Sequence, residues 1–173
     1  IFEMIKYLAT KNKKIWIDPN NTPYAIVNNK NTNSSLFIKK TCPIEFSKAI
    51  KNKTEINNMK KAHILDGTAL TKFIYWIKNI NKKQITEVDA QNKLEKFRTM
   101  NKSFLYPSFD TIAGSGKNGA IVHYRAKEEN CRVIKNKDIF LCDSGGQYKY
   151  GTTDVTRTIC FSKPSQNIKD IFT

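Results

Sequence analysis

The stretch 143–158 (DSGGQYKYGTTDVTRT) constrains the fold of this chain more than any other segment. It carries two aspartates, Asp143 and Asp154, each in a run of strand-forming residues, with glycines between them. If the two runs pair as antiparallel neighbours, both carboxylates can project from one face. Such a pair repels unless a cation lies between the side chains, and hard divalent cations prefer carboxylate oxygens. The stretch therefore predicts a metal site, with two exposed turn aspartates as the alternative for the bare spacing.

Three further residues are candidates for chemistry or for packing. Thr156 lies two positions beyond Asp154 on the same strand face and could hydrogen-bond a ligating carboxylate. His123 falls in an expected strand at 120–124, where a lone histidine is more often structural than catalytic. His63 lies on the apolar side of an expected helix and is interpreted as a packing residue.

The net charge of +15 raises the question of nucleic-acid binding. Of the 30 basic residues, 26 are lysines and 4 are arginines, and the lysines are scattered among asparagines and isoleucines. Phosphate and base recognition usually depends on arginine forks. A solvated basic surface is therefore the preferred interpretation. We expect neither a membrane-spanning helix nor a signal peptide, because a long apolar run and a basic-then-apolar leader are both lacking.

The first part of the chain predicts a small mixed region that leads into a boundary. Helical spacing of apolar residues begins at Phe2, and an Asn-rich turn is expected at 28–33. Short strands are expected at 14–18, 24–27 and 36–38. The segment 41–53 contains Pro43 and a rise in charge, which indicates a boundary.

Two helices and a set of short strands are expected next. The first helix has Thr54 as its N-cap and reaches about Asn79, and the second begins at a capping box in 86–89. Strands are then expected near 109–114, 120–124, 138–143 and 152–160, with a helix after Pro164. The four cysteines lack a metal-binding spacing, so we expect them to be reduced and mostly buried. Cys142 should point away from Asp143.

These segments together resemble a known family. The stretch 143–158 closely resembles the metal-binding hairpin of Xaa-Pro aminopeptidases (aminopeptidase P), which belong to the pita-bread metallopeptidases. The segment 108–124 resembles the strand of that family that carries a histidine. Residues 43–52 resemble the linker into the catalytic domain of that family, and residues 61–70 resemble the first helix of that domain. Residues 17–26 resemble the end of the domain that precedes it. The resemblance therefore covers essentially the whole chain in order.

The resemblance implies an α+β fold in two parts. Residues 1–45 would be the C-terminal part of a creatinase-like α/β domain. Residues 46–173 would be the N-terminal half of a pita-bread catalytic domain.

The resemblance also implies a dinuclear centre with five ligands: two aspartates, one histidine and two glutamates. Asp143 and Asp154 match the two aspartates, whereas His123 matches a histidine that contacts the substrate and the transition state. The other histidine and both glutamates have no match in this chain. The expected cofactors are two divalent cations, Mn²⁺ in particular, and the expected substrate is a peptide with a penultimate proline.

The same resemblance implies a cytoplasmic enzyme without a membrane partner and leaves open a homodimer of the full enzyme. With two of five ligands, we expect this chain to be inactive by itself. Two alternatives stay open: a non-catalytic basic binding protein on a partial pita-bread scaffold, and a half-enzyme that needs a separately encoded partner.

Overall fold

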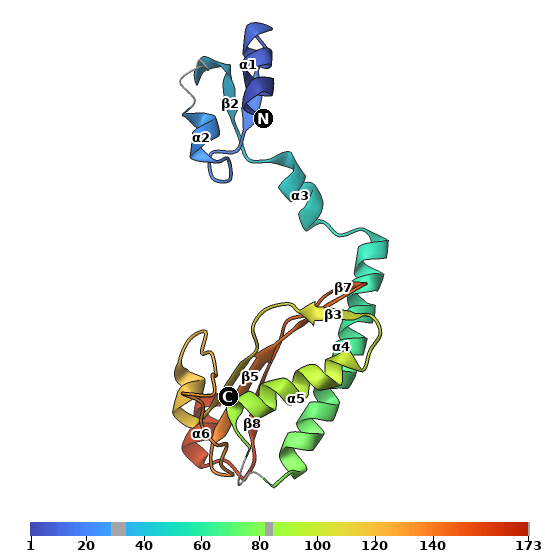
Figure 1. The fold of residues 1–173 in the computed structure, drawn as a ribbon, viewed down its shortest axis with the longest axis vertical. Coiled ribbons are helices and arrows are strands. Elements are labelled where there is room, and N and C mark those ends of the chain that lie inside the picture. Colours follow the sequence, from blue (N-terminus) through green and yellow to red (C-terminus); the bar gives the residue numbers. More distant parts are fainter. Residues whose placement is uncertain (29–33, 82–84, 173) are drawn as a thin grey trace. The chain divides into compact units, whose positions relative to one another are not determined.

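The computed structural model describes residues 1–28, 34–81 and 85–172. They form two compact units, an N-terminal unit, Ile1–Asn52, and a C-terminal unit, Lys53–Thr173. Both units combine helices with strands, which confirms the α+β prediction (Figure 1). The division expected after residue 45 stays a prediction, and helix α3 (Pro43–Ala49) lies within the N-terminal unit.

The N-terminal unit is built around a two-stranded parallel sheet. Strand β1 (Ile15–Ile17) pairs with β2 (Phe37–Lys39). The other elements of the unit are α1 (Phe2–Thr10), α2 (Tyr24–Val27) and the 3₁₀ turn η1 (Ser34–Leu36). The buried apolar side chains of this unit are Ile5, Ile17, Leu36 and Phe37. The strand expected at 14–18 is present in shortened form as β1, and the strand expected at 36–38 is present as β2, shifted by one residue.

The strand expected at 24–27 is wrong, because these residues form the short helix α2. The backbone N–H of Ile26 donates to the Pro23 carbonyl at 2.9 Å, and that of Asn28 donates to the Tyr24 carbonyl at 2.8 Å. A run of four apolar residues is too short for periodicity to separate strand from helix. Of the turn expected at 28–33, all but Asn28 lies outside the described residues.

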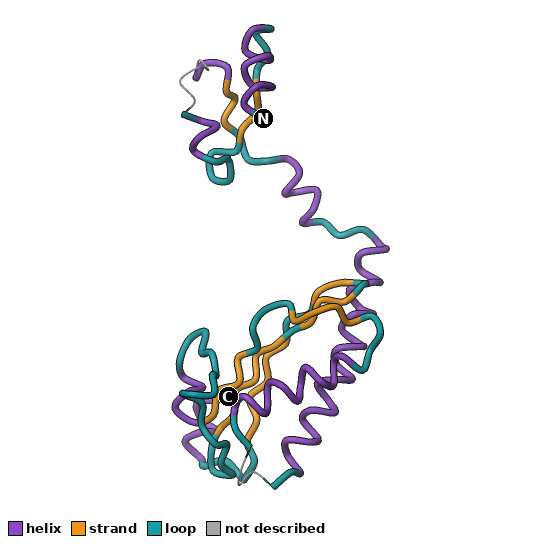
Figure 2. Tube along the Cα trace, viewed as in Figure 1, coloured by secondary structure: helices purple, strands orange, loops and turns teal. Residues whose placement is uncertain are grey.

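The C-terminal unit packs two helices against a three-stranded sheet (Figure 2). The helices are α4 (Lys53–Asn79) and α5 (Glu87–Thr99). The antiparallel sheet has the order β4 (Ile112–Ser115), β5 (Ile139–Ser144), β8 (Val155–Cys160). A second sheet has the order β3 (Phe104–Pro107), β6 (Gly146–Tyr148), β7 (Gly151–Thr152). The turn η3 (Gly116–Ala120) and helix α6 (Gln166–Phe172) complete the unit.

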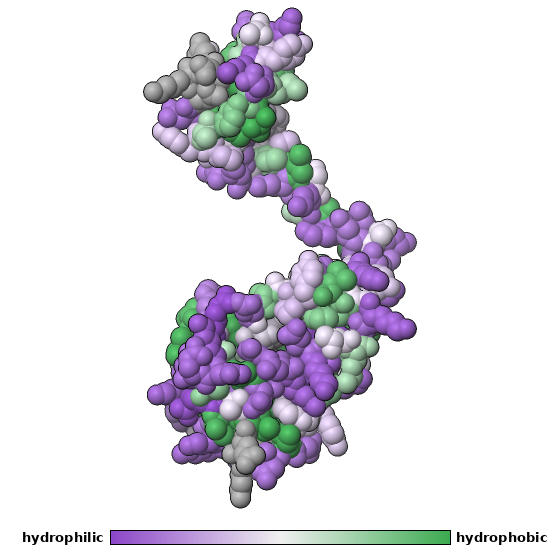
Figure 3. Space-filling model, viewed as in Figure 1, coloured by the Kyte–Doolittle hydropathy of each residue, from purple (hydrophilic) through white to green (hydrophobic). Residues whose placement is uncertain are grey.

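The expected strands near 109–114, 138–143 and 152–160 are thus present as β4, β5 and β8. Strands β3 and β6 were not expected. On the face shown in Figure 3, hydrophilic residues cover much of the C-terminal unit. None of the helices in the described part of the chain is long and apolar enough to cross a membrane.

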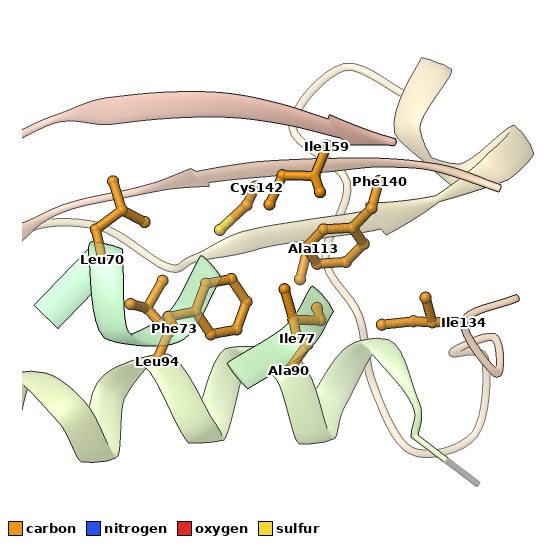
Figure 4. Packing of buried hydrophobic residues seen from close by; sticks show 10 residues of the cluster. All are labelled: Leu70, Phe73, Ile77, Ala90, Leu94, Ala113, Ile134, Phe140, Cys142 and Ile159. Atoms are coloured by element: carbon orange, nitrogen blue, oxygen red, sulfur yellow. The ribbon is translucent and has the colours of Figure 1, made fainter. Parts of the chain in front are cut away.

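The core of the C-terminal unit lies between the helices and the sheet (Figure 4). Its buried residues are Leu70, Phe73, Ile77, Ala90, Leu94, Ala113, Ile134, Phe140, Cys142 and Ile159. Cys142 is 1% exposed on this inner face, which confirms that it points away from Asp143. The other three cysteines are only half-buried, so the expectation that the cysteines are mostly buried is wrong.

The capping box of α5 is confirmed. The Thr86 hydroxyl accepts a hydrogen bond from the Asp89 backbone N–H at 3.1 Å, and Asp89 Oδ2 accepts from the Thr86 backbone N–H at 2.9 Å. Helix α4 begins at Lys53, so Thr54 is a first-turn residue and not the N-cap. Fraying of one or two residues at helix ends makes such boundaries hard to read from sequence.

The prediction of which α4 residues face the core is correct only for the second half of the helix. Phe73 and Ile77 are buried, but Ile56 is 43% exposed and Met59 is 38% exposed. His63 is exposed as well, and its Nδ1 lies 2.9 Å from the Met59 carbonyl oxygen. The packing role expected for His63 is therefore wrong, because the first turns of this long helix do not pack against the core cluster.

Candidate metal centre

Strand register determines where Asp143 and Asp154 lie. Strands β5 and β8 are antiparallel, with Asp143 opposite Thr156. Asp154 lies one residue before the start of β8 and two residues before Thr156. Because side chains alternate along an extended chain, Asp143, Asp154 and Thr156 are favoured to project from the same face of the sheet. Asp143, Asp154 and His123 line one pocket of about 400 Å³. The antiparallel pairing on which the metal hypothesis depends is therefore present.

Gly145 lets the chain segments that carry the two aspartates approach each other closely. A Cβ atom at this position would overlap the carbonyl oxygen of Thr153 and the hydroxyl of Ser108. The Ser108 hydroxyl donates to that same carbonyl at 2.8 Å, and the Gly146 backbone N–H donates to the Thr153 hydroxyl at 2.9 Å. These contacts hold Thr153, the residue directly before Asp154, against the end of β5.

One oxygen of the Asp143 carboxylate, Oδ1, is buried and lacks a hydrogen-bond partner among the described residues. An unsatisfied buried acceptor typically costs about 1–3 kcal/mol. A divalent cation would supply the lacking partner, since such cations take carboxylate oxygens as ligands. The donor set of the pocket therefore fits part of a hard-cation site. No group of three or more potential His, Cys, Asp or Glu ligands occurs within the described ranges.

His123 lies at the pocket, but not in a strand as expected. The residues at 120–124 form the end of η3 and a turn, and His123 has a φ of 55°. Left-handed backbone is uncommon outside glycine, although histidine adopts it more readily than most residues. Its side chain is exposed. The turn arises because Gly114 and Gly119 meet backbone to backbone, which folds the chain back after β4.

An ion pair between Arg125 and Asp110 lies at the same pocket. Their side chains are 62% and 70% exposed, so the pair contributes little to stability. It places one positive and one negative charge beside the two candidate ligands. The sequence analysis did not single out either residue, since an exposed charge in a loop carries no distinguishing signal.

Glu87 forms a buried hydrogen-bond centre behind the His123 turn. Its carboxylate accepts from the Ser115 backbone N–H at 2.6 Å and from the Tyr124 hydroxyl at 2.7 Å. Asn118 Nδ2 donates to both carboxylate oxygens, at 3.1 and 3.0 Å, and the Arg132 backbone N–H donates at 2.9 Å. Burial, followed by the Glu87 contact, raises the pKa of Tyr124 to about 12. Sequence reasoning missed Glu87 because an acid in the first turn of a helix is normally exposed.

A second buried polar cluster links α4, α5 and the strands. Arg98 Nε donates to Asp66 Oδ1 at 2.7 Å, and its Nη2 donates to the Ser144 hydroxyl at 3.0 Å. The Tyr148 hydroxyl also donates to Asp66 Oδ1, at 2.8 Å. Ser144 directly follows Asp143, so this cluster supports the end of β5. The signal in the sequence was Asp66 itself, a charged residue among apolar residues at helical spacing.

Thr156 lies opposite Asp143 in the sheet, but its hydroxyl makes no hydrogen bond within the described part of the chain. A contact with a ligating carboxylate therefore stays a prediction. The structure brings together Asp143, Asp154 and His123, and places Thr156 on the adjacent strand.

Two family models match the chain. The Creatinase/Prolidase N-terminal domain matches residues 1–55, and metallopeptidase family M24 matches residues 57–173. The chain therefore belongs to metallopeptidase family M24. The resemblance to the pita-bread metallopeptidases that the stretch 143–158 carries is confirmed.

Relatives of known sequence are similar to most of this chain. The chain is 48% identical over 134 residues to a probable Xaa-Pro aminopeptidase P of Paracoccidioides brasiliensis (strain Pb03), a match that covers 76% of this chain and 22% of that protein. A probable Xaa-Pro aminopeptidase P of Ajellomyces capsulatus (strain NAm1 / WU24) is 46% identical over the same length and covers the same shares. The chain thus spans about a fifth of the length of these relatives.

Solved structures show the same fold. The X-prolyl aminopeptidase of Caenorhabditis elegans, described as a cytosolic enzyme with a di-nuclear active site, superposes with a TM-score of 0.83 at 28% identity. That match covers 96% of this chain and 27% of the other chain. The Xaa-Pro dipeptidase of Bacillus anthracis gives a TM-score of 0.74 at 26% identity, with 98% and 47% covered. The partial creatinase-like and pita-bread fold is therefore established.

Proposed function

We propose that this chain carries the two-aspartate part of a metallopeptidase centre that releases an N-terminal residue preceding proline. The observation that carries the proposal is the pocket shared by Asp143, Asp154 and His123, in which Asp143 Oδ1 is buried without a protein partner. The relatives at 46–48% identity are described as probable Xaa-Pro aminopeptidases, which supports this specificity. A cytoplasmic location is part of the same proposal, because the C. elegans neighbour is described as cytosolic.

The residues of the pocket have different proposed roles, which follow from their charge and exposure. Asp143 and Asp154 would hold divalent cations, Mn²⁺ in this proposal, and would offset part of their charge. Such cations would supply Lewis acidity at the pocket. His123, exposed beside them, donates a hydrogen bond to the carbonyl oxygen of the scissile peptide as negative charge develops there. The Arg125–Asp110 pair lies at the same pocket and would place one positive and one negative charge beside a bound peptide.

We further propose that the chain is inactive by itself. The resemblance implies five ligands, and the pocket offers two aspartates toward that number. A half-enzyme completed by a separate chain is consistent with this proposal, whereas a non-catalytic basic binding protein is its competitor.

Metal binding tests the site directly. Mn²⁺ is titrated into the chain and followed by the electron paramagnetic resonance of the unbound ion. We expect Asp143→Asn and Asp154→Asn each to weaken Mn²⁺ binding by about tenfold or more, because each removes a charged ligand. Asp170→Asn, an exposed carboxylate on α6, is the matched control and should bind Mn²⁺ like the unaltered chain. Equal Mn²⁺ affinity in the unaltered chain and the three variants would contradict the proposed metal site.

Hydrolysis separates the enzymatic proposal from its competitor. A tripeptide with proline in second position is incubated with Mn²⁺ and the chain, with and without the part of the C. elegans enzyme that follows the matched segment. Hydrolysis in the mixture that is lost with Asp154→Asn would support a half-site. No hydrolysis in either sample, together with salt-sensitive binding to a nucleic acid, would favour the basic binding protein.

A further inference from the structure

We infer that Glu87 is the positioning residue for His123: its buried carboxylate ties both ends of the segment 115–124 and thereby holds the His123 turn at the pocket. The functional meaning of this inference rests on the role proposed for His123. The positioning itself is a property of the described contacts and is testable without metal or substrate.

The carboxylate contacts the start, the middle and the end of this segment. The backbone N–H of Ser115 donates to it at the end of β4, and Asn118 Nδ2 donates to both of its oxygens from η3. The Tyr124 hydroxyl donates to it from the residue that directly follows His123. Since Asn118 Nδ2 also donates to the Tyr124 hydroxyl at 2.9 Å, the three partners form one connected network.

Glu87 is itself anchored on two sides. It is 0% exposed, and its backbone N–H donates to the Arg132 carbonyl oxygen at 3.0 Å while its carboxylate accepts from the Arg132 N–H. It also begins α5, whose capping box is complete. The network therefore connects the His123 turn to a rigid element of the core, not to another loop.

A residue at the pocket needs such support. His123 has a φ of 55°, and backbone strain of this kind persists only where the surroundings hold it. The side chain of His123 makes no hydrogen bond with the described residues, so its position depends on the backbone at either side. Tyr124 supplies that constraint, because it is 7% exposed and its N–H also donates to the Ile121 carbonyl oxygen.

A carboxylate suits this place because it accepts hydrogen bonds and donates none. Four separate donors converge on Glu87. Glutamine has the same shape, but its NH₂ group would face donors where an acceptor is required. Glu87→Gln therefore changes the network with little change in volume.

The chain offers a favourable readout, since it has only two histidines. In a ¹³C–¹H correlation spectrum of the imidazole groups, His123 reports on the turn, and His63, exposed on α4, serves as the internal reference. We expect Glu87→Gln to shift or broaden the His123 signals and to leave those of His63 in place. Glu129→Gln, the same chemical change at an exposed turn residue, is the matched control and should leave both histidines unchanged.

Tyr124→Phe is the second variant and keeps the inference testable if Glu87→Gln does not fold. It removes one donor of the network and retains the ring, so a smaller shift of the His123 signals is expected. If Glu87 only added stability, the variants would unfold more readily while the His123 signals of the folded protein stayed where they are. That result would overturn the inference, whereas failure of the Mn²⁺ titration would overturn only the proposed function.

Discussion

The guanidinium of Arg98 and the carboxylate of Asp66 form a two-point ion pair in which both side chains are 1% exposed. The Nε–Oδ1 distance is 2.7 Å and the Nη2–Oδ2 distance is 3.2 Å. The pair joins α5 to α4, and through Ser144 it reaches the strand that carries Asp143. Buried pairs of this kind do not guarantee net stability, but removal of one partner leaves an uncompensated charge.

Arg98→Met is therefore expected to lower the free energy of unfolding by about 3–5 kcal/mol, because it leaves Asp66 buried without its cation. Urea denaturation followed by far-ultraviolet circular dichroism measures the change. Lys96→Met, at an exposed position of the same helix, is the control and should stay within about 0.5 kcal/mol. A loss below about 1 kcal/mol for Arg98→Met would contradict the importance of the pair.

Gly145→Ala is expected to destabilise the C-terminal unit and to abolish Mn²⁺ binding, because its Cβ would overlap the Thr153 carbonyl oxygen. Gly67→Ala is the matched control. It lies within α4, nothing lies within 4 Å of its added Cβ, and it should stabilise the protein by about 0.4–1 kcal/mol. Thermal unfolding and Mn²⁺ titration of both variants check the pair of expectations. Equal behaviour of the two alanine variants would show that the close approach at Gly145 is unimportant.

The buried phenol of Tyr124 is expected to lower the free energy of unfolding at alkaline pH. Burial, and then the Glu87 contact, raises the pKa of its phenol to about 12, above the ordinary value of 10.0. The stabilisation is fully present below about pH 10 and is lost as the pH rises toward about 12, since the unfolded chain releases its proton first. One such group changes the free energy of unfolding by up to about 1.4 kcal/mol per pH unit.

In Tyr124→Phe this contribution is removed, so the fall in unfolding free energy above about pH 10 should be shallower than in the unaltered chain. Urea denaturation at several alkaline pH values measures both slopes. Tyr148, whose pKa is also raised by burial and by Asp66, contributes equally to both proteins. Parallel curves would mean that Tyr124 titrates normally.

Cys142 should react more slowly with thiol reagents than the other cysteines. It is 1% exposed, and burial raises the pKa of its thiol to about 11, so little reactive thiolate forms at neutral pH. Cys42, Cys131 and Cys160 are half-buried. Titration with a disulfide reagent should modify these three in the folded protein, and Cys142 only after unfolding. Reaction of all four at one rate would contradict the packing of Cys142 in the core.

Local patterns predicted much of this protein. The capping box at Thr86 and Asp89 predicted the start of α5, because its contacts span only three residues. The alternation across Cys142 and Asp143 predicted which of them enters the core, because neighbouring side chains of a strand point to opposite faces. The strand predicted at residues 24–27 was wrong, because an apolar run of four residues is too short to show a helical or a strand period.

Long-range contacts were beyond such patterns. Glu87 and Arg98 look like ordinary surface charges of a helix. Both are buried against partners from distant parts of the chain, which are β4 and η3 for Glu87, and α4 and β5 for Arg98. His123 was expected in a strand, but the close backbone approach of Gly114 and Gly119 turns the chain before it.

The sequence by itself determined the family of this protein and the two aspartates, because the motif that carries them is contiguous and its strand period is local. The tertiary structure alone decided that Asp143, Asp154 and His123 share one pocket, since that depends on the register of β5 with β8 and on a turn supported from another helix. It also decided which charged side chains are buried. Burial depends on what packs around a residue, and distant parts of the chain supply that packing.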